Sequence, residues 1–237
     1  MRDAGALKQA PPLDVDLKIL IGLGVAAGIA WLTPFDLAFG AATFGVPALR
    51  AVAIMAIALA GLHFGARIGL GIEPTGLKRP IVMPVAVAAG VAVACAISDW
   101  TFRASLPGSY VGVMSQPLAL RLSLYMLRAF NENIIYRLFL GSALIWLIGR
   151  VWRTADRRPA EGAYWAGFAI SQAANVWINV TSQGPIAPLG VVHDILRYFA
   201  PGMVWSWLYR RHGFQSNEIA CTTVHVFFQP LVTLGLR

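Results

Sequence analysis

The amino-acid sequence predicts an all-α, polytopic bundle of about seven membrane-spanning helices that forms one integral membrane domain, residues 1–237. Hydrophobic residues make up 57% of the chain and charged residues 13%, with a mean hydropathy of +0.64, whereas a soluble surface needs more charge. Apolar segments near the length that crosses a hydrocarbon core of ~30 Å recur along the whole chain. They are 17–34, 46–72, 80–98, 118–148, 163–181, 186–209 and 216–236. An eighth span is expected if one of these is broken or re-entrant.

Basic residues lie at alternate ends of the predicted spans. They are Lys78 and Arg79 after the second span, Arg150, Arg153, Arg157 and Arg158 after the fourth, and Arg210 and Arg211 after the sixth. Because positively charged loops stay in the cytoplasm, this distribution predicts a cytoplasmic N-terminus and a multi-pass protein of a bacterial inner membrane. Topology thus accounts for the net charge of +8, so we expect contact with membrane lipids and no nucleic-acid partner.

Polar and ionisable side chains gather in the last four predicted spans. Each ionised group near the centre of a membrane costs roughly 2.5–3.5 kcal/mol, so a lipid-facing position is excluded for them. Their spacing, as in Arg128 with Glu132 or His225 with Gln229, places each set on one helix face. We expect these faces to meet in a polar site inside the bundle. The alternative, a bundle held by interhelical hydrogen bonds, explains the amides but not a buried glutamate and arginine.

The most specific segment is 131–140, in the middle of a long apolar run. It resembles the EExxxR signature of the CPBP family, the intramembrane proteases that process CAAX proteins and bacteriocins. Glu132 matches the first glutamate of that signature, Asn133 replaces the second, and Arg137 matches the arginine. On this basis residues 118–230 resemble the family's core.

Two further family motifs have weaker counterparts in the later spans. The FxxxH motif falls at 171–175, where Asn175 stands in place of the histidine. The HxxxN motif resembles 225–229, which keep His225 and exchange the asparagine for Gln229.

The resemblance implies a role for each of these side chains. Glu132 would activate a water molecule for attack on a peptide bond, and His225 with Gln229 would stabilise the oxyanion. Asn175 can orient the water but cannot accept its proton. Arg137 is implied to fix the helix geometry, with Asn133 as a neutral hydrogen-bond acceptor. Since acid–base assistance contributes about 10²–10⁴-fold, we expect hydrolysis to be impaired or absent.

Three classes of function remain open on these residues. The first is an intramembrane endopeptidase that cuts a peptide or membrane-protein substrate. The second is a non-catalytic CPBP-fold protein that binds a partner, or acts as accessory subunit of a membrane complex. The third, a transporter or proton conductor, is least favoured because no inverted repeat is visible.

His193 is a further candidate partner of Glu132, although a membrane histidine is more often hydrogen-bonded to a neighbour, here Asp194. Zinc bound by Glu132, His193 and His225 is not favoured, since ligands on three helices show no metal-type spacing. No metal and no cofactor are therefore predicted.

Overall fold

The computed structural model of the protein describes residues 17–33, 45–73, 76, 78–181 and 188–236. Over these ranges the chain is mostly helical and forms no β-strand, which confirms the predicted all-α class. The N-terminus, predicted to be cytoplasmic, lies outside the described residues, as does position 186, where the sixth span is predicted to begin.

Most of the helices follow the predicted spans. In chain order they are α1 (Leu17–Leu32), α3 (Pro47–Ile68), α4 (Val82–Thr101), the 3₁₀ turn η1 (Arg103–Ser105), α5 (Gly108–Met114), α6 (Leu118–Asn133), the π-helical segment η2 (Ile134–Gly141), α7 (Ser142–Ile148), α8 (Glu161–Thr181), α9 (Pro188–Asp194), the π-helical segment η3 (Ile195–Phe199), α10 (Ala200–His212) and α11 (Phe214–Leu236). The fourth predicted span is the continuous run α6–η2–α7, and the sixth is α9–η3–α10. The short helix α5 and both π-helical segments are absent from the prediction.

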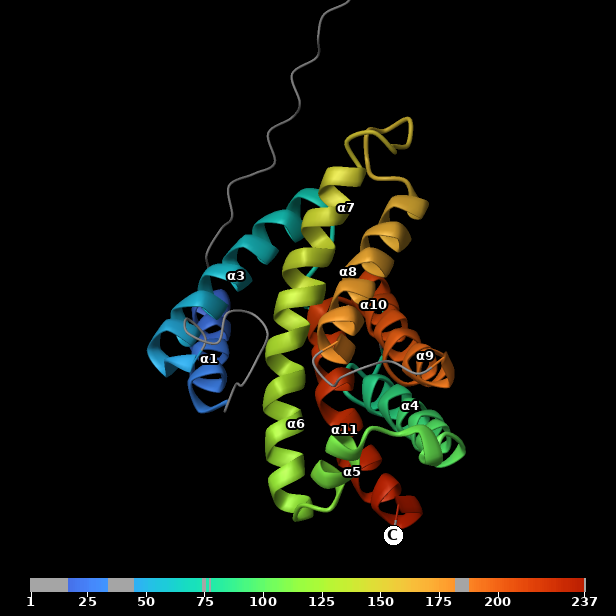
Figure 1. Ribbon diagram of the computed structural model, residues 1–237. Coiled ribbons are helices and arrows are strands. Elements are labelled where there is room, and N and C mark those ends of the chain that lie inside the picture. The colour runs from blue at the N-terminus through green and yellow to red at the C-terminus, as the bar shows by residue number, and fades with distance from the viewer. Residues whose placement is uncertain (1–16, 34–44, 74–75, 77, 182–187, 237) are drawn as a thin grey trace, which may run out of the picture.

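The run α6–η2–α7 forms the axis of the bundle (Figure 1). Helices α1 and α3 lie on one side of it, and α4, α9 and α11 lie on the other. Helix α3 packs against α1 and η2, while α11 packs against α4, α6 and α10. Helix α8 lies against η2 and α7 and also contacts α10 and η3, so it touches both π-helical segments.

Helices α3 and α4 are the two described helices that are long and apolar enough to cross a membrane by length and composition. Only 39% of the most apolar window of each is buried inside the bundle. Their outward faces carry large apolar side chains, among them Val52 and Leu59 on α3 and Val93 and Ile97 on α4. Exposed apolar side chains on two long apolar helices are compatible with contact to a membrane or a partner.

The contact between α3 and η2 depends on the small residue Gly61. A Cβ atom added at this glycine would lie 2.8 Å from the carbonyl carbon and oxygen of Leu138, so the two backbones are in direct contact.

We predict that Gly61→Ala pushes α3 away from η2 and lowers the free energy of unfolding by about 1–3 kcal/mol. Thermal unfolding of the purified protein in detergent measures the change. The matched control is Gly90→Ala on α4, where a Cβ atom meets nothing within 4 Å. Equal melting temperatures for the two variants would contradict the close contact.

Candidate functional site

A cavity of about 170 Å³ lies among α4, α5, α6, η2, α8, η3, α10 and α11. The structure brings Glu132 of α6, Asn175 of α8 and His225 of α11 to this one cavity. Arg128 and Arg137 also line it. Five of the predicted site residues thus share one cavity.

Helical spacing explains how each element contributes several side chains to the cavity. Helix α6 presents positions 125, 128, 129 and 132, α8 presents 172, 175 and 176, and α11 presents 221, 224 and 225. Positions three, four and seven residues apart occupy one face of an α-helix. The cavity is therefore built from single faces of three helices and closed by η2, η3, α10, α4 and α5.

The three polar residues at the end of α6 point in three directions. Asn131 Nδ2 donates a hydrogen bond to Thr33 Oγ1 at 2.8 Å. Glu132 turns to the cavity, and Asn133 Nδ2 donates to Glu218 Oε2 at 2.8 Å. Asn133 Oδ1 has no hydrogen-bond partner among the described residues. Asn133 is therefore not the acceptor for Arg137 that the resemblance implies, because the rotation of about 100° per residue turns it toward α11 instead.

Glu132 forms an ion pair within its own helix. Arg128 Nε lies 2.7 Å from Glu132 Oε1, and their side chains are 36% and 18% exposed. The pair is therefore partly accessible to the surroundings. The carboxylate of Glu132 carries a permanent counter-ion one helical turn away.

Arg137 is held by α8 rather than by α6. It lies in η2, its side chain is buried, and Nη2 donates a hydrogen bond to Gln172 Oε1. Gln172 Nε2 in turn donates to the carbonyl oxygen of Tyr198 in η3 at 3.0 Å. Gly202 leaves room for this amide, since a Cβ atom there would come within 2.0 Å of Gln172 Cδ. One glutamine side chain therefore joins Arg137 to η3.

His225 stacks on Tyr125 of α6, with ring centroids 5.4 Å apart and an interplanar angle of 24°. Its Nδ1 atom is buried and has no hydrogen-bond partner within the described part of the chain.

Gln229 lies one turn beyond His225 on α11 and does not line the cavity. Its Oε1 accepts a hydrogen bond from Arg121 Nη1 at 3.0 Å, and the whole residue is buried. The structure therefore does not bring His225 and Gln229, the two predicted oxyanion donors, to the same cavity. Arg121 of α6 binds the Gln229 side chain one helical turn away, where α6 and α11 pack together.

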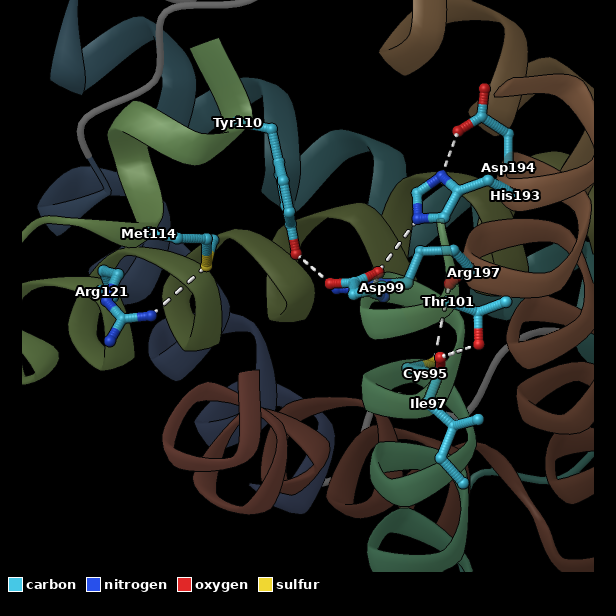
Figure 2. Close-up of polar contacts among 10 residues, drawn as sticks. All are labelled: Cys95, Ile97, Asp99, Thr101, Tyr110, Met114, Arg121, His193, Asp194 and Arg197. Atoms are coloured by element: carbon cyan, nitrogen blue, oxygen red, sulfur yellow. Dashed lines mark hydrogen bonds and ion pairs between the residues drawn. The ribbon is translucent and has the colours of Figure 1, made fainter. Parts of the chain in front are cut away.

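His193 belongs to a second polar cluster next to the cavity (Figure 2). Its Nε2 lies 3.0 Å from Asp99 Oδ1, and its Nδ1 lies 3.2 Å from Asp194 Oδ1. Asp99 also forms an ion pair with Arg197 Nε at 3.2 Å and accepts a hydrogen bond from the hydroxyl of Tyr110. His193 is therefore a partner of two aspartates and not of Glu132.

Sequence reasoning missed Asp99 because the residue follows an apolar run, where a carboxylate is expected at the membrane surface. The residue is fully buried at the end of α4. The only signal for its burial is the pair His193 and Arg197, four residues apart and in need of a counter-charge.

The described residues contain no group of three or more histidine, cysteine, aspartate or glutamate side chains arranged to hold a metal ion. Cys95 and Cys221 are free thiols that both line the cavity. The site thus combines a carboxylate, an imidazole, an amide and several guanidinium groups from separate helices.

Comparison of the chain with protein-family models, with curated proteins and with solved structures found no match.

We predict that Gln172→Met lowers the free energy of unfolding by about 1–3 kcal/mol, because it leaves the Arg137 guanidinium and the Tyr198 carbonyl without their shared partner. Chemical unfolding in mixed micelles measures the loss. Ser123→Ala is the control, since Ser123 is exposed and bonds only the Ala119 carbonyl of its own helix. A loss no larger than that of the control would show that Gln172 does not hold the two segments together.

Proposed function

We propose that the protein is a CPBP-like intramembrane endopeptidase homologue with impaired catalytic power. The observation that supports this proposal is the convergence of Glu132, Asn175 and His225, from three helices, on one cavity. These are the positions that the resemblance assigns to the water-activating pair and to an oxyanion donor.

In the proposed reaction the Glu132 carboxylate accepts a proton from water, and the water oxygen attacks the carbonyl carbon of the scissile peptide bond. His225 donates a hydrogen bond to the oxygen that becomes negatively charged. Asn175 orients the water. Glu132 then returns its proton to the leaving nitrogen.

Two features of the site reduce the expected rate. Asn175 cannot share the proton as a histidine would, and acid–base assistance contributes about 10²–10⁴-fold. Gln229 is bonded to Arg121 outside the cavity, and the loss of one oxyanion donor costs about 10²–10³-fold.

The second candidate is a non-catalytic CPBP-fold protein that binds a peptide or a partner membrane protein, as accessory subunit of a membrane complex. The ion pair of Arg128 with Glu132, at 2.7 Å, favours this candidate. A carboxylate already paired with a guanidinium is a poorer acceptor for a proton from water.

Both candidates place the chain in a bacterial inner membrane as a multi-pass bundle of seven spans, with a cytoplasmic N-terminus. The two long apolar helices α3 and α4 and their outward apolar side chains support this placement. The proposed ligand is a peptide or a membrane protein, and lipids cover the outward faces.

We predict that the purified protein cleaves fluorogenic peptides slowly and that Asn175→His raises the rate by about 10²-fold, because it restores the missing proton acceptor. Glu132→Ala is expected to abolish cleavage in both backgrounds. Peptide hydrolysis in detergent, followed by fluorescence and mass spectrometry, measures these rates.

The outcomes separate the two candidates. Cleavage that survives Glu132→Ala refutes the proposed mechanism. Absence of cleavage in the wild type and in Asn175→His refutes the endopeptidase and leaves the binding protein.

We predict opposite sides of the membrane for the α4–α5 connection, 102–107, and the α7–α8 connection, 149–160. Alkaline phosphatase, which is active only in the periplasm, should be active when fused after residue 105 and inactive when fused after residue 155. Equal activity at both positions would contradict a membrane crossing by α6–η2–α7.

A further inference from the structure

The cavity contains more positive than negative groups. Its lining includes the guanidinium groups of Arg128, Arg137 and Arg197 but only one carboxylate, that of Glu132. Arg128 pairs with Glu132 at 2.7 Å, and Arg197 pairs with Asp99, behind the lining, at 3.2 Å. Each of these two arginines therefore has a carboxylate partner.

Arg137 has no carboxylate partner within the described part of the chain. It is 4% exposed, its Nη2 donates to the neutral Gln172, and its Nε is buried without a hydrogen-bond partner. Glu132 and Glu218 act on Arg137 only at longer range, since Glu132 pairs with Arg128 and the two Glu218 oxygens accept hydrogen bonds from Asn133 and Thr222. A buried cation with no carboxylate in direct contact is unfavourable, so this guanidinium is expected to attract an anion.

A second polar side chain, that of His225, lies on the same cavity. His225 Nδ1 is buried and has no hydrogen-bond partner among the described residues. The planar fork of an arginine matches the oxygen pair of a carboxylate or phosphate, and an imidazole N–H can bind one of the same oxygens. The Arg128–Glu132 pair that lines the cavity is partly exposed, with side-chain exposures of 36% and 18%.

We propose that the cavity is a binding site for a singly charged oxyanion, a carboxylate or a phosphodiester group, with Arg137 as its counter-ion and His225 as a second donor. A single negative charge matches the one lining cation that has no carboxylate partner in the described residues. The site uses the same cavity as the proposed function but requires no hydrolysis.

The test measures the melting temperature of the full-length protein in detergent against increasing formate or dimethyl phosphate, with chloride at equal ionic strength as the reference. Saturable stabilisation is expected with at least one of the two oxyanions and not with chloride. The arm that responds identifies the carboxylate or the phosphodiester as the preferred group. Absence of a saturable response in both arms overturns the proposal.

Two variants with opposite expected effects locate the anion. Arg137→Gln should abolish the saturable stabilisation, while Arg103→Gln, at an exposed arginine of η1 outside the cavity, should retain it. Glu132→Gln should tighten binding by at least about fivefold, because it removes the only lining carboxylate and frees Arg128. An undiminished response in Arg137→Gln overturns the proposal.

The Glu132→Gln titration decides the matter even if Arg137→Gln fails to fold, since unchanged or weaker binding in this variant also overturns the proposal. The assay is independent of peptide cleavage. Anion binding without hydrolysis would refute the endopeptidase alone, and hydrolysis without anion binding would refute the anion site alone.

Discussion

Two adjacent side chains of α8 hold the cavity together by bonding to both π-helical segments. The Ser171 hydroxyl donates to the carbonyl oxygen of Tyr136 in η2, and the Gln172 amide donates to that of Tyr198 in η3. A π-helical segment shifts the backbone hydrogen bonds by one residue, so carbonyl groups become available to other donors. Helix α8 supplies those donors to both segments and thereby fixes the positions of Arg137 and Arg197 at the cavity.

The buried polar groups of the bundle form three separate sets: the Arg121–Gln229 contact, the cluster around Asp99, and the lining of the cavity. Arg121 donates a hydrogen bond to Gln229 Oε1 in a packed layer, where the Gln229 Nε2 atom is buried without a partner among the described residues. The Asp99 cluster neutralises Arg197 beside the cavity. In the cavity layer, buried polar atoms of Arg137 and His225 have no hydrogen-bond partner among the described residues. Unsatisfied buried groups are costly and few in native proteins, so those on the cavity-lining Arg137 and His225 call for an explanation.

Several features of this arrangement were predictable from the sequence. The apolar lengths locate the helices, because a span needs about 20 residues to cross the hydrocarbon core. The spacing of Arg128 with Glu132 predicts that both lie on one helix face, and the resemblance to the family motifs implies that Glu132, Asn175 and His225 meet. The helix positions and faces follow from apolar length and periodicity, which are local properties of the sequence, whereas the grouping of the three residues follows from the resemblance.

Other features depend on contacts between distant residues and were not predictable. No local pattern distinguishes the π-helical segments from ordinary helix. Gln229 follows His225 by one turn, yet its amide is bound by Arg121, 108 positions away in the chain. Asn133 similarly pairs with Glu218 rather than with Arg137. In each case the partner is chosen by helix packing and not by spacing within one helix.

The most direct test of the account is whether position 175 of α8 and Cys221 of α11 face the same cavity. In a Cys95→Ser background, a short bifunctional thiol reagent should cross-link the native Cys221 to a thiol introduced by Asn175→Cys. The same reagent should not cross-link it to one introduced by Ala173→Cys, because Ala173 is exposed on the opposite side of α8. No cross-link at position 175, or equal cross-linking at both positions, would contradict the shared cavity.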